Sequence, residues 1–300
     1  MLNSYITVEN FFSDADRMRT CIDHFFGDPD HDSGISHQIW NYWHVPGLYT
    51  YLRTEPTRVI PLELMEQFLQ LLQHWSIGVL GLSRISHPYL SLYINGCGQG
   101  LHNDAGNGRW GFVYSLTHWD AHRFTGGETL IFKDSPYLET EAIRHPTAGL
   151  GLYDLVPPRF NQLLVFDDRL IHAVPSLQGG MSPREGRIVI HGHIGEGGVQ
   201  VQGTLSHRDV ARVLYSVQPY VDSQLASFAR PFHGCIAVRL TIACSGVVVE
   251  AVKLTDRILR TRPSIIDTEQ FTSDLVAFLQ TLHFPVSNGQ TLVTIPIVVT

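Results

Sequence analysis

The chain contains few cysteines, few charged residues and no excess of positive charge. Only four of its 300 residues are cysteine, and they form no Cys-x-x-Cys pair, which favours reduced thiols in a cytoplasmic protein. Charged residues make up 16% of the chain, and the formal net charge of −7 argues against a protein that follows nucleic-acid phosphates. We therefore expect no nucleic-acid partner.

The chain also lacks long apolar segments. No apolar run reaches the roughly 18 residues that span a bilayer, so we expect no membrane association. Residues 1–5 show no basic region followed by an apolar stretch, so no secretory signal peptide is expected. A hydrophobic content of 44% is typical of a globular chain with a real core, and 300 residues suit one large domain or two smaller ones.

Two histidines and one aspartate have the spacing of metal ligands. Residues two apart on a strand point to the same face, so His102 and Asp104 can hold one ion, and His172 can approach from a neighbouring strand. Two histidines and a carboxylate form the facial triad of non-haem Fe(II), which leaves metal positions open. A His-x-Asp pair alone is weak evidence, because the chain has 16 histidines and 28 acidic residues, and solvent-facing histidines are the alternative.

Short runs of β-forming residues surround these candidate ligands. Turn-forming residues separate the runs, which is typical of an antiparallel sandwich or barrel. The runs lie at residues 89–95, 112–116, 126–132, 162–166 and 186–193. Upstream, residues 5–12 predict a strand, and helical spacing at 62–72 predicts an amphipathic helix that covers one face of the sheet.

With these features in this order, roughly residues 1–200 resemble the Fe(II)/2-oxoglutarate-dependent dioxygenases, in particular the prolyl-4-hydroxylase-like branch. The resemblance is carried by Tyr93, the His102/Asp104 pair, residues 126–128, residues 163–166 ahead of His172, and Arg187. It implies a mainly β fold with flanking helices, built on a double-stranded β-helix (jelly-roll). It also implies Fe(II) held by the catalytic triad, incorporation of O2 with release of succinate and CO2, and ascorbate as an optional reductant.

The cosubstrate 2-oxoglutarate would need a cation for its far carboxylate, and Arg187 can supply a planar, bidentate partner. Arg184 is the competitor, but it lies in a predicted surface turn at residues 182–186. An exposed strand arginine is the alternative for Arg187. The family often has a hydroxyl residue two positions after this arginine, where the chain has Val189. Tyr93 is therefore our candidate for a second hydrogen bond, with a plain core tyrosine as its alternative.

Three further segments have open interpretations. For the aromatic residues at 40–44 and 49–51 we favour a packed loop over a wall of the substrate pocket. His118 and His122 could hold a metal if they lay on one helix, but a loop over the active-site mouth is the preferred interpretation. Residues 134–160 form a long connection in which we expect substrate contacts, without naming a residue.

The pattern changes after the predicted oxygenase domain at residues 1–204. A helical linker is expected at 205–228, followed by a small β-β-α-β domain at 229–300 that resembles the TonB C-terminal domain. An exposed edge strand there could pair with a peptide partner or with a second subunit to make a homodimer. A closed structural appendage is the equally open alternative.

We therefore predict an Fe(II)- and 2-oxoglutarate-dependent hydroxylase that oxidises an unactivated C–H bond. The preferred substrate is an amino-acid residue in a peptide or protein, and a free amino acid or small natural product is the alternative. A non-catalytic jelly-roll binding or sensor module is the alternative from another class. A cupin-type metalloenzyme that uses no 2-oxoglutarate is a third, and Arg187 argues against it because a cupin needs no buried carboxylate clamp.

Overall fold

The computed structural model describes residues 5–27, 39–133, 152–226, 232–260 and 267–299. The chain forms two compact units. The first contains the described residues up to 71 and residues 85–194, and the second contains residues 72–84 and those from 195 onward. Helix α3 (Leu62–Val79) therefore contributes to both units.

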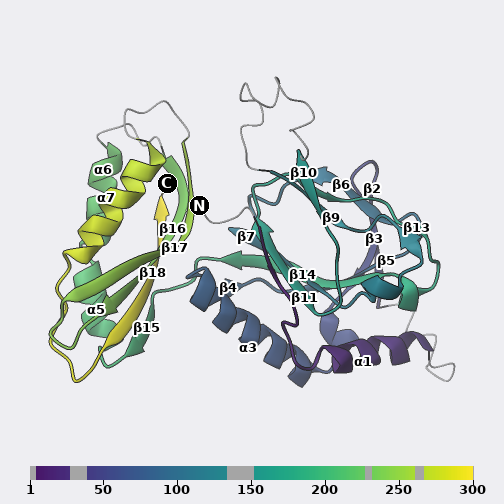
Figure 1. Cartoon of the computed structure of the whole chain (residues 1–300), viewed down its shortest axis with the longest axis horizontal. Coiled ribbons are helices and arrows are strands. Elements are labelled where there is room, and N and C mark those ends of the chain that lie inside the picture. The colour runs from purple at the N-terminus through teal and green to yellow at the C-terminus, as the bar shows by residue number, and fades with distance from the viewer. Residues whose placement is uncertain (1–4, 28–38, 134–151, 227–231, 261–266, 300) are drawn as a thin grey trace. The chain divides into compact units, whose positions relative to one another are not determined.

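The first unit is built on one curled antiparallel sheet (Figure 1). Its strands follow the order β1-β11-β7-β14-β5-β3-β6-β12-β9-β10, with β2 beside β3 and β4 beside β14. The bounds are β1 Tyr5–Val8, β2 Asn41–Val45, β3 Tyr49–Thr54, β4 Arg84–Ile85, β5 Tyr89–Tyr93, β6 Gly98–His102, β7 Trp110–Ser115, β9 Thr129–Phe132, β10 Tyr153–Val156, β11 Gln162–Asp167, β12 His172–Val174 and β14 Arg187–Gly195. The prediction of a mainly β fold is confirmed, and the curled sheet fits the predicted jelly-roll core.

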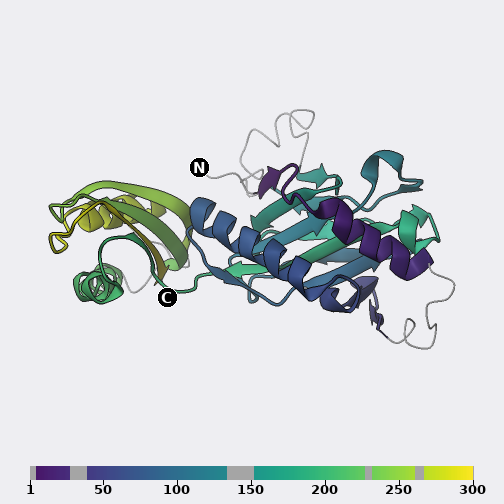
Figure 2. The same ribbon diagram turned by 90° about the horizontal axis from the view of Figure 1, so that it is seen from below.

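Two helices cover the outer face of this sheet, and their apolar side chains are buried against it. Helix α1 (Ala15–Gly27) buries Met18 and Ile22 completely. In the first half of α3, Phe68 is fully buried and its ring lies 4.7 Å from that of Tyr114 on β7. Figure 2 shows both helices running along the same side of the sheet. Because both helices pack on the outer face of the curled sheet, its inner face is available to line a cavity.

Short elements complete the first unit. Strands β8 (Phe124–Thr125) and β13 (Gln178–Gly179) pair in a separate small sheet. Three 3-10 turns occur at η1 (Pro56–Arg58), η2 (Trp119–Ala121) and η3 (Pro183–Glu185). Most of the predicted long connection at 134–160 lies outside the described residues, and its described end contains β10.

The second unit is a four-stranded antiparallel sheet with helices on one face (Figure 1). The strand order is β15-β18-β16-β17, with bounds β15 Gln200–Gly203, β16 Phe232–Ile242, β17 Val248–Arg260 and β18 Thr291–Val299. The helices are α5 (His207–Leu214), α6 (Val217–Ala226) and α7 (Thr268–Gln280). Val210, Val221 and Leu275 from these helices are buried in one core with the sheet.

The segment predicted as a helical linker, residues 205–228, contains α5 and α6. Both helices contribute apolar side chains to the core of the second unit. Among the described residues, no helix is long and apolar enough to cross a membrane. The likeness of this unit to the TonB C-terminal domain stays a prediction.

Candidate metal centre

Two of the predicted ligands face each other across a strand pair. Strands β6 and β12 are antiparallel, and His172 lies directly opposite His102 in their register. Their ring centroids are 4.3 Å apart. Directly opposed residues on one face of a sheet have close side chains, so the pairing itself brings these imidazoles together. The third ligand must come from the loop that follows β6.

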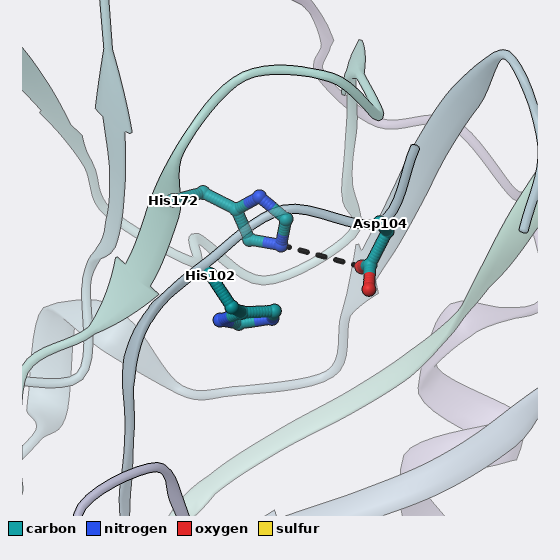
Figure 3. Close-up of side chains that lie close together, drawn as sticks. All are labelled: His102, Asp104 and His172. Atoms are coloured by element: carbon teal, nitrogen blue, oxygen red, sulfur yellow. Dashed lines mark ion pairs between the residues drawn. The ribbon is translucent and has the colours of Figure 1, made fainter. Parts of the chain in front are cut away.

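Asp104 lies two residues beyond the end of β6, so the expectation that it shares a strand with His102 is wrong. Its backbone N–H donates to the carbonyl of Asp168 at 2.8 Å, and its carbonyl accepts from Asn107. With these hydrogen bonds, the backbone at Asp104 forms a turn and no longer pairs as part of strand β6. The turn still aims the carboxylate at the histidines, and Oδ2 of Asp104 lies 3.4 Å from Nε2 of His172 (Figure 3).

The side chains of His102, Asp104 and His172 are oriented as a ligand set. Each offers one ligand atom, and these atoms lie within 4.8 Å of one another. Nδ1 of His102 lies 2.7 Å from the carbonyl of Gly100, and Nδ1 of His172 lies 3.0 Å from the carbonyl of Leu170. A carbonyl can only accept, so Nδ1 carries the proton and Nε2 presents its lone pair.

Electrostatics keeps these groups in their ligand forms. Burial, and then the neighbouring His172, lowers the pKa of His102, so its imidazole is neutral near neutral pH. Burial acts to raise the pKa of Asp104, but the neighbouring His172 outweighs that effect and the pKa is lowered. A neutral imidazole and an ionised carboxylate are the forms that bind a metal ion.

A second pair of residues, which the sequence analysis did not single out, supports this site. Asp168 is fully buried, and its carboxylate lies 3.0 Å from Nδ1 of His193 on β14. With Asp104, these residues also form a cluster whose ligand atoms lie within 4.8 Å of one another. Burial raises the pKa of Asp168 to about 6 despite the opposing effect of His193.

Two glycines make room for the buried carboxylate. A Cβ at Gly108 would lie 2.9 Å from Oδ2 of Asp168, and one at Gly111 would lie 2.8 Å from Oδ1. Contacts this short require a shift, so both positions exclude larger side chains while Asp168 keeps its place. The sequence gives little indication of this supporting pair. A glycine occurs for many structural reasons, and the Asp168–His193 contact joins residues 25 apart.

We expect Asp168→Asn to weaken divalent metal binding at pH 7.5 by about 10- to 100-fold, as is typical for residues that support metal ligands. The substitution removes a negative charge close to Asp104, and it replaces the carboxylate that pairs with His193 by a neutral amide. Titration of the purified variant with Fe(II) or Co(II) measures the effect. Asp120→Asn, at an exposed aspartate of η2, is the control, and equal affinities in the two variants would contradict a supporting role for Asp168.

Arg187 is a buried cation beside the candidate ligands. It is 1% exposed and pairs in register with Tyr93 across β14 and β5. Its NH2 group donates to the hydroxyl of Thr129 at 3.2 Å, and its Cζ lies 4.6 Å from the centre of the Tyr93 ring. Nε of Arg187 is buried and has no hydrogen-bond partner among the described residues. Burial lowers the pKa of Arg187 and raises that of Tyr93.

A buried guanidinium without a carboxylate is costly, so its surroundings indicate an anion-binding site. Among the described residues, no acidic side chain forms an ion pair with Arg187. Thr129, which lies on β9 and accepts the hydrogen bond of Arg187, has no distinguishing signal in the sequence. Arg184, the competing arginine, lies in η3 with a side chain 53% exposed, as expected for a surface turn.

The candidate ligands and Arg187 line one cavity of about 510 Å³. Aromatic residues from β2 and β3 form part of its lining: Trp43, Tyr49 and Tyr51. The expectation of a packed loop at 40–44 and 49–51 is therefore wrong, because these residues form a hairpin. The missed signal was Pro46-Gly47, a turn pair in which Gly47 adopts φ 75° and Leu48 donates to the Val45 carbonyl.

His118 and His122 do not line this cavity. They flank η2, where the ring of His122 stacks on Trp119 at 4.1 Å and that of His118 stacks on Phe160 at 5.1 Å. The two rings are therefore held by separate aromatic neighbours, and neither belongs to a metal-capable cluster among the described residues.

No protein-family model matches the chain, and no curated protein matches it in sequence. Solved structures do resemble part of it. A prolyl-4-hydroxylase from Pseudomonas putida is 18% identical, with a TM-score of 0.44, and the match covers 65% of this chain and 94% of that one. A prolyl hydroxylase from Trichoplax adhaerens, in complex with a hypoxia inducible factor peptide, is 13% identical, with a TM-score of 0.45 and coverages of 63% and 82%.

HygX from Streptomyces hygroscopicus, with nickel, 2-oxoglutarate and hygromycin B bound, is 10% identical, with a TM-score of 0.41. That match covers 63% of this chain and 81% of HygX. At such low identities we base the function of this chain on the geometry of its own site.

Proposed function

We propose that this chain is an Fe(II)- and 2-oxoglutarate-dependent hydroxylase. The observation that carries the proposal is the combination of two features in one cavity: a His-His-Asp ligand set and a fully buried arginine that forms no ion pair with any described acidic residue. A ligand set alone would suit a structural metal ion, and a buried arginine alone would suit many anions. Together they provide for a metal ion and for an anionic cosubstrate at the same place.

The residues present fit Fe(II). Nε2 of His172 lies 3.4 Å from the Asp104 carboxylate, His102 offers a ligand atom within 4.8 Å of both, and the Nδ1 atoms of the two histidines are fixed by backbone carbonyls. Two imidazoles and one carboxylate suit a non-haem Fe(II) that keeps open coordination positions. When bound, Fe(II) and 2-oxoglutarate supply the oxidising power to hydroxylate a C–H bond, with succinate and CO2 as by-products.

The residues present also fit a dicarboxylate cosubstrate. Arg187 would bind the far carboxylate, and the hydroxyl groups of Thr129 and Tyr93 lie beside it. Tyr93 is 2% exposed and Thr129 is also buried, so both hydroxyl groups lie away from bulk water. A hydrogen bond to a charged group is stronger in such an environment than in water. Arg187 would thus orient the cosubstrate from one end, and a metal ion held by His102, Asp104 and His172 would bind its other end.

For the primary substrate we propose an amino-acid residue of a peptide or protein, with a free amino acid or small natural product as the alternative. The cavity of about 510 Å³ supports a substrate of this size, and Trp43, Tyr49 and Tyr89 line it. No disulfide joins the four cysteines, which supports a reducing compartment such as the cytoplasm. Docking of a peptide or a second copy on the second unit stays a prediction; its long strand β17 lies at a sheet edge.

The proposal is tested by following 2-oxoglutarate conversion to succinate in purified protein. We expect conversion that requires added Fe(II), stops with a chelator and returns when Fe(II) is restored. Ascorbate should extend the number of turnovers without being consumed stoichiometrically. Iron-bound, folded protein that converts no 2-oxoglutarate with any peptide or amino-acid candidate would favour a non-catalytic binding or sensor module.

A further inference from the structure

A second arginine lines the same cavity, and its partners are aromatic. Arg53 lies on β3, between the hairpin strand β2 and β5. Its Cζ lies 3.7 Å from the ring centre of Trp43 and 4.3 Å from that of Tyr89. Both rings line the cavity beside the ligand set and Arg187. Cation–π contacts hold a guanidinium by its flat face and leave N–H groups on its edge for hydrogen bonds.

Among the described residues, Arg53 has no acidic partner. The Tyr51 hydroxyl interacts with it, and Ser91 lies opposite it in the β3–β5 register. Ser91 in turn lies 2.7 Å from Nε2 of His191, a side chain that burial and nearby cations keep neutral. The neighbours of Arg53 are therefore neutral.

The charges of the proposed complex leave Arg53 without a counter-charge. Two positive charges of Fe(II) and one of Arg187 are balanced by Asp104 and the two carboxylates of 2-oxoglutarate. His193 is paired with Asp168. Among the described residues that line the cavity, Arg53 then remains the cation with no anionic partner. A cation held in place and left unbalanced in a cavity is suited to an anionic group of the substrate.

We propose that Arg53 binds a carboxylate of the primary substrate, so that the preferred substrate is an amino acid whose carboxylate is free. A planar carboxylate matches the edge of a guanidinium in a bidentate manner. The inference rests on the proposed function and narrows its substrate class to amino acids with a free carboxylate, which excludes internal residues of a protein. Two sources share this chemistry, a free amino acid and the last residue of a peptide.

The test compares acids with their neutral counterparts on the complete chain, loaded with Fe(II) and 2-oxoglutarate without oxygen. The probes are the N-acetyl amino acids, each as the free acid and as the carboxamide, with binding measured by calorimetry. We expect at least one acid to bind about 10- to 100-fold more tightly than its amide, the range of a charged hydrogen bond. In Arg53→Gln this preference should disappear, while 2-oxoglutarate affinity changes less than about twofold.

Control variants separate the local effect from general ones. Arg212→Gln removes a positive charge from an exposed helix position in the second unit and should keep the full preference for the acid. Arg53→Lys keeps the charge without the planar edge and should retain only part of it. If Arg53→Gln does not fold, the acid–amide comparison in the unmodified protein and in Arg53→Lys still decides.

The outcomes are distinguishable. Equal binding of acids and amides, binding of no acid, or a preference that survives in Arg53→Gln each overturn the role of Arg53 while leaving the proposed function in place. Failure of the unmodified protein to bind 2-oxoglutarate with Fe(II) overturns the proposed function itself. Unacetylated amino acids and acetylated tripeptides with free C-termini then show which source of carboxylate is preferred.

Discussion

His172→Ala is expected to reduce iron-dependent conversion of 2-oxoglutarate by well over about 100-fold, more than the loss of a supporting residue causes. His172 is 5% exposed and holds a central place, since it lies opposite His102 and contacts the Asp104 carboxylate. Without its imidazole, only two ligands remain. Succinate formation measured over a range of Fe(II) concentrations gives the effect, and Asp104→Ala should behave in the same way.

His118→Ala is the matched control for His172→Ala. His118 is exposed, stacks on Phe160 and does not line the cavity. We expect the activity of the His118→Ala protein to stay within about twofold of that of the unmodified protein, as for most surface substitutions. A His172→Ala protein that is folded and retains most of its activity would show that the metal is held elsewhere.

Arg187→Met is expected to have two opposite effects. The affinity for 2-oxoglutarate should fall by about 2–5 kcal/mol, or roughly 30- to several-thousand-fold, because a buried charge partner of the carboxylate is removed. The free energy of unfolding of the ligand-free protein should be unchanged or raised, because an unpaired buried cation is replaced by an apolar side chain of similar length. Binding titrations and thermal unfolding of the same samples measure both.

This combination distinguishes a binding arginine from a structural one. If Arg187 were structural, its substitution would lower the free energy of unfolding of the protein, and any loss of 2-oxoglutarate affinity would follow from that lower stability. Arg184→Met, at the exposed arginine of η3, is the control and should alter neither quantity by more than about 0.5 kcal/mol. Unaltered 2-oxoglutarate affinity in Arg187→Met would show that the carboxylate clamp is a different residue.

Local patterns in the sequence predicted much of this arrangement. The β-forming runs and the turns between them predicted the mainly β fold, and the need for a bidentate cation pointed to Arg187, which the structure places on β14 facing the cavity. His102 and His172 also followed from strands, because opposed strand positions bring side chains together. Asp104 was the exception, since its N–H bonds to Asp168, a long-range contact that its neighbours in sequence do not reveal.

Contacts between distant parts of the chain account for what the sequence did not predict. Asp168 and His193 meet through the pairing of separate strands, and neither carries a local signature. Arg53 has no local signature in the sequence, because the rings of Trp43 and Tyr89 reach it only through the pairing of β3 with β2 and β5. Helices α5 and α6 have short apolar patterns that suit a linker equally well, and their burial depends on a sheet formed later in the chain.

The most direct measurement of the central claim is an anaerobic optical titration of purified protein with Fe(II) and 2-oxoglutarate. We predict a visible metal-to-ligand charge-transfer band that needs both components, is absent in His172→Ala, and requires far more 2-oxoglutarate in Arg187→Met. Folded protein that binds Fe(II) and shows no such band at saturating 2-oxoglutarate would contradict the assignment and favour a metal site that uses no 2-oxoglutarate.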